Sequence, residues 1–413
     1  MFDVLTQIAL ILVVGIALKA FADRINFPAI VFFILGGTLL VTWNFIDLGS
    51  LQPLPELIRT LALIIVVFSS AFYLKLQEIR KQSLNIIFLA TIGVLVTAMI
   101  ITATTLYLLP IALVTAAFLG VLLCGTDPAA ISAAFSKKQS KLTTILGAES
   151  LFNQPLTVIL PLFLLDYIIR PETAWMNVPK LISLIVVGGV VGFVGAVLGQ
   201  KLLNYSKAKH EEIVGLMIAI AVYVIAENLF GSGILAVVVC GLLLTSSKIP
   251  AKKWLGVFNR ELAFLFTIFV FVLLGSEFSF DQLDFTKMEI FAVIAALFLG
   301  RMLMSLLILY KSDLKISDKI KIGLIAPKGI APAALAPLLL KPGYNIIGAD
   351  MVVKITYIAI IISIIFSLII LKVFVAKPTE KEEIKKEVEK KKEQRERKNG
   401  KIAEVVQKVK EQL

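Results

Sequence analysis

Histidine and cysteine are almost absent from this sequence, which contains one histidine and two cysteines. His210 lies in a charged stretch, so a histidine-based metal site or charge relay has no support. Cys124 and Cys240 fall in apolar segments, where buried free thiols are expected instead of a disulfide framework. The sequence also lacks a nucleophile–base pair, a cluster of metal ligands and a phosphate-binding loop. We therefore expect neither an enzyme nor a bound cofactor.

Charged residues are scarce as well: they make up 17% of the sequence, whereas 58% of the residues are hydrophobic. The apolar residues form blocks of about 20 residues between short charged loops, which is typical of membrane-spanning helices. The net charge of +12 would suggest nucleic-acid binding in a soluble protein. In a membrane protein Lys and Arg collect in cytoplasmic loops, so we expect a lipid environment and no nucleic acid.

The apolar blocks predict an all-α polytopic membrane domain over residues 1–376 with about thirteen spans. Residues 2–22 lack a basic leader and a cleavage site, so they are predicted to be the first span and not a signal peptide. The predicted spans cover residues 2–22, 28–43, 54–74, 84–109, 112–135, 143–168, 181–203, 211–229, 233–247, 260–278, 287–311, 320–340 and 350–376.

Basic residues in the predicted loops alternate with the span number. The loops after odd-numbered spans are rich in Lys and Arg, such as Lys137, Lys138 and Lys141, whereas the loops after even-numbered spans are nearly free of them. One missed or additional helix would invert every later loop, so the regular alternation supports the span count. Because cytoplasmic loops carry the excess of basic residues, we predict a cell-membrane protein with its N-terminus outside and its C-terminus inside.

The composition changes abruptly at the end of the last predicted span. Residues 377–413 are dominated by Lys and Glu, with Glu–Lys pairs at helical spacing. A thin apolar stripe runs through this segment at Ile402, Val405, Val406, Val409 and Leu413. Two interpretations are open: a cytoplasmic helix that contacts a regulatory partner, and a solvated charged tail.

Two predicted spans contain helix-breaking residues in apolar surroundings. In the fifth span, Gly125–Pro128 combines a glycine, a carboxylate and a proline that removes a backbone donor. In the twelfth span, Ala326–Pro332 contains two prolines, a glycine and Lys328. Backbone groups freed at membrane depth persist only where they line a cavity or are buried in protein. Both breaks are therefore candidates for a functional site.

The two breaks hold the same place in two six-helix halves, spans 1–6 and 8–13, which thirteen spans would put in opposite orientation. Interrupted helices at corresponding positions of inverted repeats mark transporter sites, so we predict that Asp127 binds a cation. The alternative for Asp127 is a proline kink in which its carboxylate caps the second half-helix. For Lys328 two interpretations are open. Its ammonium group would neutralise the carbonyl groups at the helix ends when the site is empty, or its side chain would extend to the membrane interface.

The sixth predicted span has a polar face, because Glu149 and Asn153 are four residues apart. Arg301, in the eleventh span, is the natural ion-pair partner of Glu149, since neither charge should be buried alone. We interpret this pair as a structural support of the site. Glu227, at the end of the eighth span, is either an acidic group at an outer mouth or a helix-end residue that faces water.

Together these motifs resemble the cation:proton antiporter superfamily, in particular its NhaP and sodium/proton exchanger branch. The resemblance covers about residues 1–376 and implies an NhaA/NhaP-like antiporter fold, with two inverted six-helix repeats and interrupted helices that cross. It also implies a homodimer, with a dimerisation domain beside a six-helix core, and elevator-like alternating access. The matching segments are Asn26–Pro28, Ile34–Gly37, Gly125–Pro128, Glu149–Asn153, Gly231–Val238 and Ala326–Gly329, in which the family more often has Arg than Lys328.

The resemblance further implies that Thr126, Asp127, Ser150 and the residue after Asn153 surround the cation. The family has Asp after that asparagine, whereas this sequence has Gln154. A glutamine can coordinate a cation through its carbonyl oxygen, but it cannot titrate. Proton coupling would then fall to Asp127.

We predict exchange of Na⁺, or of another monovalent cation such as K⁺, for protons, a reaction that serves pH homeostasis. Two alternatives follow from Gln154: a transporter of a different ion, and a degenerate homologue that acts as a cation-binding sensor or scaffold without coupled flux.

Overall fold

The computed structural model describes residues 3–25, 27–51, 54–73, 83–128, 130–131, 141–172, 178–205, 211–247, 252–276, 288–341 and 343–375. The predicted tail over residues 377–413 and the basic loop that contains Lys137 and Lys138 lie outside the described residues. The chain divides into two compact units, Met1–Leu368 and Ile369–Leu413. Only residues 369–375 of the second unit are described, so the helix arrangement given below belongs to the first unit.

Each predicted span has a helical counterpart, and the described residues contain no β-strand. The fourth span is one continuous helical run with a π-helical turn, η1 (Leu89–Gly93), between α5 and α6. The first helices are α1 (Val4–Arg24), α2 (Ala29–Thr42), α3 (Leu54–Tyr73), α5 (Ser83–Phe88), α6 (Val94–Leu108), α7 (Leu113–Cys124) and α9 (Lys141–Ile169). They are followed by α10 (Val178–Tyr205), α11 (Glu211–Asn228), α12 (Gly233–Ser246), α13 (Lys252–Ser276), α14 (Met288–Ile308), α15 (Ile316–Leu324), α16 (Ile330–Leu335), the 3₁₀ turn η4 (Ala336–Leu340) and α17 (Ala349–Val375).

Seven of the described helical runs are long and apolar enough to cross a membrane. The helices at the two predicted breaks, α7 and α15–α16, are shorter because the chain leaves helical geometry in the middle of each span. The predicted start of the tenth span at residue 260 is wrong, since α13 already begins at Lys252. Hydropathy missed its first two turns because they contain the charged residues Lys252 and Lys253. Arg260 and Glu261, at the predicted edge of the span, pair on an exposed part of the helix.

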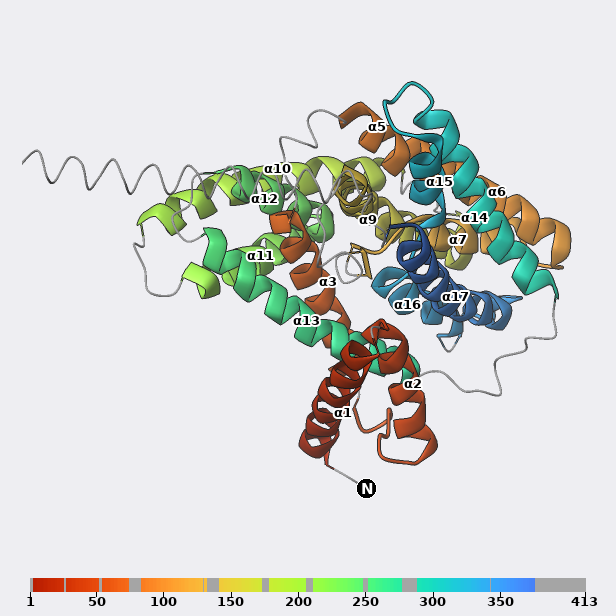
Figure 1. Ribbon diagram of the computed structural model, residues 1–413, viewed down its shortest axis with the longest axis horizontal. Coiled ribbons are helices and arrows are strands. Elements are labelled where there is room, and N and C mark those ends of the chain that lie inside the picture. Colours follow the sequence, from red (N-terminus) through yellow and green to blue (C-terminus); the bar gives the residue numbers. More distant parts are fainter. Residues whose placement is uncertain are drawn as a thin grey trace, which may run out of the picture. The chain divides into compact units, whose positions relative to one another are not determined.

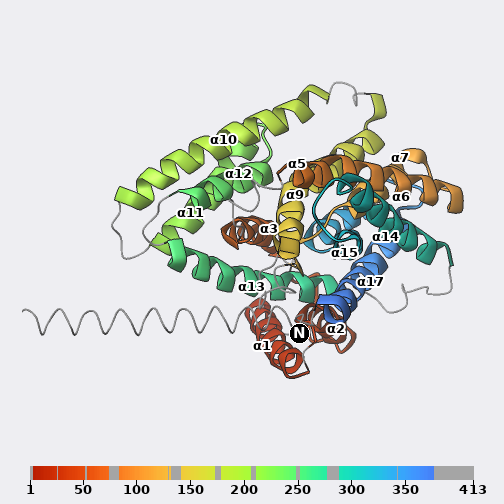
Figure 2. The same ribbon diagram turned by 45° about the horizontal axis from the view of Figure 1, so that its top comes forward.

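The helices form two groups of neighbours. In one group α10, α11 and α12 lie side by side, α3 packs on α12 and α13, and α13 also packs on α1 and α2 (Figures 1 and 2). In the other group α6 packs on α7 and α14, and α14 packs on α15. Helix α9 contacts both groups, since it touches α7 and α16 as well as α3 and α12.

Glycines allow α2 and α13 to touch through their backbones. A Cβ atom added at Gly37 would lie 1.9 Å from the carbonyl oxygen of Val272, and one added at Gly275 would lie 1.9 Å from that of Ile34. The hydroxyl of Thr38 donates a hydrogen bond of 2.9 Å to the carbonyl of Gly275. In a membrane, small residues of this kind let helices associate closely through van der Waals contact.

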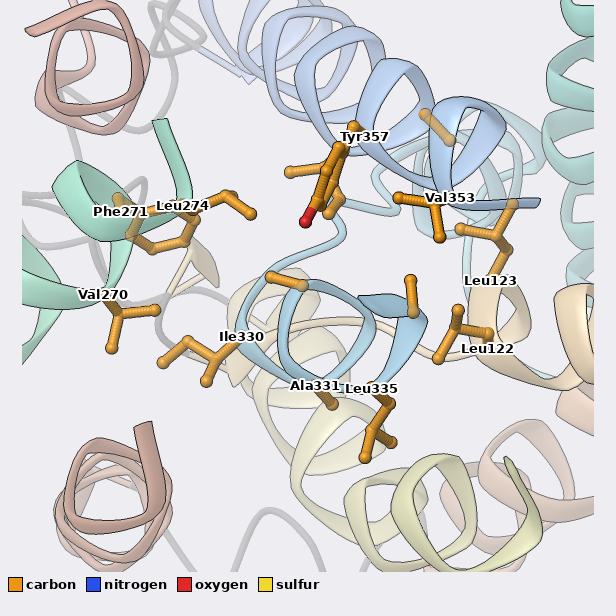
Figure 3. Close-up of a cluster of buried hydrophobic side chains, with 14 of the residues drawn as sticks. Leu122, Leu123, Val270, Phe271, Leu274, Ile330, Ala331, Leu335, Val353 and Tyr357 are labelled. Atoms are coloured by element: carbon orange, nitrogen blue, oxygen red, sulfur yellow. The ribbon is translucent and has the colours of Figure 1, made fainter. Parts of the chain in front are cut away.

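The second broken span is held by a large buried apolar cluster. Figure 3 shows α16 at the centre of this cluster, with side chains from three other helices around it. Ile330, Ala331 and Leu335 belong to α16, and their surroundings are Leu122 and Leu123 of α7, Val270, Phe271 and Leu274 of α13, and Val353 and Tyr357 of α17. Apolar packing thus fixes the short helix that begins at the second break.

Candidate functional site at the crossing of two broken helices

The two predicted breaks meet in the structure. Helix α7 ends at Cys124 because Gly125 is extended, with φ −77° and ψ 175°. Helix α15 ends at Leu324, and α16 begins only after Gly329. The backbone N–H of Asp127 donates a hydrogen bond of 3.0 Å to the carbonyl of Pro327, so the two non-helical segments are joined directly. The prediction of interrupted helices that cross is confirmed.

The carboxylate of Asp127 caps helical segments on both sides of the crossing. One oxygen, Oδ1, accepts a hydrogen bond of 2.8 Å from the N–H of Ala130, and Oδ2 accepts one of 2.9 Å from the N–H of Ile330. A negative charge at a helix N-terminus is stabilising, because the first N–H groups have no partner within the helix. The carboxylate therefore caps the second half of its own span, as the capping interpretation of Asp127 expects. In addition it caps the start of α16, which the sequence did not predict.

Gly329 lets the carboxylate of Asp127 approach the start of α16. A Cβ atom at residue 329 would lie only 2.0 Å from Oδ2 of Asp127. Any side chain at this position would push the carboxylate away from the N–H of Ile330. Residue 329 must therefore be a glycine, because the Asp127 carboxylate of the other broken span lies so close to its backbone.

Lys328 points into the crossing and not towards the membrane interface. Its side chain is buried, with 1% of its surface exposed, and its Nζ donates a hydrogen bond to the carbonyl of Gly125 at the end of α7. Its backbone N–H donates to the hydroxyl of Ser363, at 2.9 Å. A positive charge at a helix C-terminus offsets the partial negative charge of the last carbonyls. The predicted role in neutralising carbonyl ends matches this geometry.

Glu149 and Arg301 form the ion pair that the sequence predicts. Oε1 of Glu149 lies 2.7 Å from Nη2 of Arg301, and both side chains are buried. Nη1 of Arg301 also donates a hydrogen bond of 3.4 Å to the carbonyl of Cys124, which ties the pair to the end of α7. The second oxygen of Glu149 and Nε of Arg301 have no hydrogen-bond partner among the described residues. The pair contacts the frame of the site and does not line its cavity.

A small cavity opens beside the crossing, with room for about one water-sized particle. Among the predicted site residues, it is lined by Thr126, Asp127, Gln154 and Lys328, and Gly125 and Thr157 add to its wall. The side-chain amide of Gln154 is 2% exposed and forms no hydrogen bond with a described residue. Its carbonyl oxygen can therefore serve as a ligand in this cavity.

Two predicted ligands lie behind the cavity wall. Nδ2 of Asn153 donates a hydrogen bond of 3.0 Å to the hydroxyl of Thr126, so Asn153 orients a cavity residue. The hydroxyl of Ser150 donates to the carbonyl of Gly147 in its own helix, at 3.0 Å. Neither Ser150 nor Asn153 is among the residues that line the cavity.

Three polar residues near the site were not predicted. Ser363 and Ser367 of α17 accept hydrogen bonds from the N–H groups of Lys328 and Ala326, which the break leaves without helical partners. The two serines are four residues apart and lie on one face of an apolar span, a pattern from which a polar contact could have been predicted. Thr157, three residues after Gln154, continues the polar face of α9 into the cavity wall.

Glu227 lies away from this site and caps a helix. Its Oε1 accepts a hydrogen bond of 2.8 Å from the N–H of Gly233, the first residue of α12, while the hydroxyl of Ser232 accepts one from Leu235. Of the two interpretations of Glu227, the exposed helix-end residue agrees with this geometry.

The cavity offers room and oxygen ligands for one small cation. Its wall offers oxygen atoms from the Thr126 and Thr157 hydroxyls, the Gln154 amide and the Asp127 carboxylate. Oxygen ligands are the kind that alkali and other hard cations prefer. In the described part of the chain, no group of three or more His, Cys, Asp and Glu residues is placed to hold a metal ion. The arrangement therefore offers one carboxylate, neutral oxygens and one ammonium group.

Comparison with known proteins gives the same picture over most of the chain. The family model "Sodium/hydrogen exchanger, transmembrane" matches residues 8–377. The chain is 26% identical over 348 residues to the probable Na⁺/H⁺ antiporter 2 of Methanocaldococcus jannaschii, with 79% of this chain and 82% of that protein covered. It is 24% identical over 339 residues to the K⁺/H⁺ antiporter NhaP of Alkalimonas amylolytica, covering 80% of this chain but only 59% of that longer protein.

A solved structure shares the fold. The sodium proton antiporter MjNhaP1 from Methanocaldococcus jannaschii, determined at pH 8, superposes with a TM-score of 0.77 at 23% sequence identity. The match covers 88% of this chain and 95% of that one. The all-helical, multi-span architecture predicted from the sequence is thereby confirmed.

Proposed function

The chain belongs to the sodium/hydrogen exchanger family, and from this membership we propose that it is a secondary transporter that exchanges a monovalent cation for protons. Family members are transporters and not enzymes, as the sequence predicted. Na⁺ is the cation we expect first. K⁺ is the main alternative, since the relatives include both a probable Na⁺/H⁺ antiporter and a K⁺/H⁺ antiporter.

The observation that carries this proposal is the polar cavity at the crossing of the two broken helices. Asp127, Thr126 and Gln154 line it from two different spans, and Lys328 lines it from a third. Such a site within otherwise apolar helices is costly to bury, and polar groups at membrane depth mark ion pathways. In alternating access, the site would open to one side of the membrane at a time.

The membrane topology and the assembly are part of the proposal. We propose that the protein lies in the cell membrane with its N-terminus outside and its C-terminus in the cytoplasm, as the loop charges predict. We also propose a homodimer. Light scattering of the purified protein in detergent should give the mass of two chains after subtraction of the micelle, and a mass of one chain would contradict the dimer.

The exchange reaction can be tested in proteoliposomes that contain a pH-sensitive dye. We expect an inward gradient of Na⁺ or K⁺ to raise the internal pH, because a proton leaves the liposome as a cation enters. An outward gradient should lower it. Both effects are expected between about pH 5 and 9. Protein-free liposomes treated with the same gradient provide the control. If neither Na⁺, K⁺ nor Li⁺ produces a pH change over this range, the proposed exchange is wrong.

Gln154 motivates a second candidate function, a cation-binding sensor without coupled flux. The cavity has a neutral amide where the family places a carboxylate. This candidate predicts that Na⁺ or K⁺ raises the thermal stability of the protein, because a ligand stabilises the state that binds it, while no flux is observed. Flux in the liposome experiment would exclude it.

A further inference from the structure

Thr157 lines the cavity, although it lies outside the motifs predicted from the sequence. It follows Gln154 by three residues on α9, and its side chain is buried, with 4% of its surface exposed. Its hydroxyl donates a hydrogen bond of 3.0 Å to the backbone carbonyl of Gln154. A hydroxyl oxygen that donates one hydrogen bond still has its lone pairs. Thr157 can therefore offer an oxygen atom to a cation while its own hydrogen bond holds the side chain in place.

The methyl group of Thr157 packs against the end of α7. A Cβ atom added at Gly125 would lie 2.1 Å from Cγ2 of Thr157, 3.1 Å from its Cβ and 3.4 Å from its Oγ1. Two carbon atoms in van der Waals contact are about 3.5–4.0 Å apart, so the first of these distances is a severe clash. The methyl group therefore occupies the space that a side chain at residue 125 would need.

Space, and not backbone conformation, requires the glycine at residue 125. Gly125 has a φ of −77° and a ψ of 175°, which lie in the extended region that any residue adopts. The carbonyl group of the same residue accepts a hydrogen bond from Nζ of Lys328. One apolar contact and one polar contact thus hold Gly125 in place relative to α9 and to the second broken span.

This contact sets part of the width of the cavity, because Gly125 and Thr157 both line it. The cavity has room for about one water-sized particle, and its wall also includes Thr126, Asp127 and Gln154. In so small a space one methyl group is a large change in volume. Protein pockets discriminate between ligands that differ by one such group by roughly 10- to 200-fold.

We propose that Thr157 determines which monovalent cation the cavity selects, an inference that rests on the proposed exchange function. Its methyl group, packed on Gly125, holds the cavity wall at a distance that fits one size of ion. Its hydroxyl oxygen is one of the ligands that replace the water around that ion. The methyl group therefore sets the preference between small and large cations, and the hydroxyl group adds affinity for all of them.

Two substitutions separate these contributions, because each removes one of the two groups on Cβ. Thr157→Ser keeps the hydroxyl and removes the methyl group, so the cavity can widen towards Gly125. We expect the half-saturating concentration of K⁺ to fall by about tenfold relative to that of Na⁺. Thr157→Val keeps the branched shape and removes the oxygen. It should raise the half-saturating concentrations of both cations by about tenfold and leave their ratio unchanged.

A further pair of variants moves the methyl group from one side of the contact to the other. Gly125→Ala alone should destabilise the protein and abolish exchange, because its Cβ would clash with Cγ2 of Thr157. In Gly125→Ala/Thr157→Ser the clashing atom is gone, and the nearest remaining atom is Cβ of residue 157, at 3.1 Å. The double variant should therefore fold, and the ratio of the two half-saturating concentrations should return to the wild-type value.

The ratio can be measured as flux and as binding. Exchange in proteoliposomes gives the half-saturating concentrations of Na⁺ and K⁺ for transport. In detergent, the rise of the unfolding temperature with each cation gives the concentrations for binding, because a ligand stabilises the state that binds it. Both measurements report a selectivity, which a general loss of stability does not change.

Thr105 is the matched control. It is also buried, and its hydroxyl also donates to a carbonyl of its own helix, that of Ile101 at 2.7 Å. It does not belong to the residues that line the cavity. Thr105→Ser and Thr105→Val should therefore keep the wild-type ratio.

A wild-type ratio in Thr157→Ser would overturn the inference, and so would a folded double variant that keeps the ratio of Thr157→Ser. The same holds if neither Na⁺ nor K⁺ raises the unfolding temperature of the wild-type protein, because the cavity then binds neither cation. If the wild-type protein binds cations but does not exchange them, the proposed function fails. In that case the ratios measured in detergent still decide the role of Thr157.

Discussion

The carboxylate of Asp127 accepts a hydrogen bond of 2.9 Å from the backbone N–H of Ile330, which is 203 positions away in the sequence. Its other oxygen caps the segment that begins after Pro128. One negative charge thus stabilises the starts of two helical segments from different halves of the chain. The geometry of the crossing and the charge of the cavity depend on the same side chain.

Replacement of Asp127 by Asn should weaken both the fold and transport. Asparagine leaves one side-chain oxygen for two N–H donors, so we expect a loss of about 1–2 kcal/mol in stability. Removal of the carboxylate from the cavity should also abolish cation-driven pH changes. Thermal unfolding in detergent and the liposome assay measure the two effects. Asp47→Asn, which changes an exposed loop carboxylate, is the control. Normal exchange by Asp127→Asn would show that the site is assigned to the wrong residue.

Replacement of Gly329 by Ala should disrupt the crossing, because the added Cβ would lie 2.0 Å from Oδ2 of Asp127. We expect a loss of about 1–3 kcal/mol, the cost of overpacking a tight contact, together with loss of exchange. Gly189→Ala is a matched control, since a Cβ there would meet no atom within 4 Å. In mid-helix it should be neutral or stabilising by up to about 1 kcal/mol. Equal unfolding temperatures for the two variants would contradict this account.

Removal of one partner from the Glu149–Arg301 pair should destabilise the protein strongly. Arg301→Met leaves a buried, unpaired carboxylate, for which we expect a loss of about 3–5 kcal/mol. The double variant Glu149→Leu/Arg301→Met should recover most of this loss, since neither charge remains. If the pair is only structural, the double variant also keeps measurable exchange. If the double variant folds but shows no exchange, the pair contributes to transport and not only to stability.

Replacement of Gln154 by Asp should strengthen cation binding. The new carboxylate adds a charged oxygen to the cavity wall that Gln154 now lines. We expect the cation concentration for half-maximal exchange to fall by about tenfold, the effect of roughly 1.4 kcal/mol of added attraction. Gln154→Asn has nearly the same size as Gln154→Asp but no charge, so it separates charge from shape. Identical concentration dependence in the two variants would mean that residue 154 does not contact the cation.

The proposed orientation can be tested by labelling single cysteines. Both native cysteines are buried, so they give a low background. Ile347→Cys lies in a predicted outer loop. Tyr310→Cys lies at the predicted cytoplasmic end of the eleventh span, just after α14 ends at Ile308. Both native side chains are highly exposed. A membrane-impermeant maleimide should label Ile347→Cys in intact cells and Tyr310→Cys only after permeabilisation. The reverse pattern would invert the topology.

Local sequence features were sufficient to predict the spans and their breaks. Apolar blocks have the length of a membrane-spanning helix, and the prolines and glycines near Asp127 and Lys328 act on their own backbone. The Glu149–Arg301 pair could be predicted because a buried charge needs an opposite charge. The start of α13 could not be found by hydropathy, because its first turn, with Lys252 and Lys253, is charged but still helical.

The hydrogen bonds of the site could not be predicted, because they depend on how separate helices approach each other. The sequence does not reveal that Ser150 turns back to its own helix while Gln154 faces the cavity, although both lie in α9. Nor does it reveal that Ser363 would satisfy the backbone of Lys328. These contacts depend on how each packed helix is rotated about its axis and shifted along it. Amino-acid composition carries no information on either.

The sequence by itself determined that this protein crosses a membrane and where its helices break, since hydrophobicity and proline act within a few residues. It also determined that residue 154 cannot titrate. Only the tertiary structure decided which groups the two breaks bring together: the Asp127 carboxylate between two helix starts, and the Lys328 ammonium on the Gly125 carbonyl. The physical reason is that both charges are stabilised by unpaired backbone groups of another segment, and these become neighbours only when the broken helices cross.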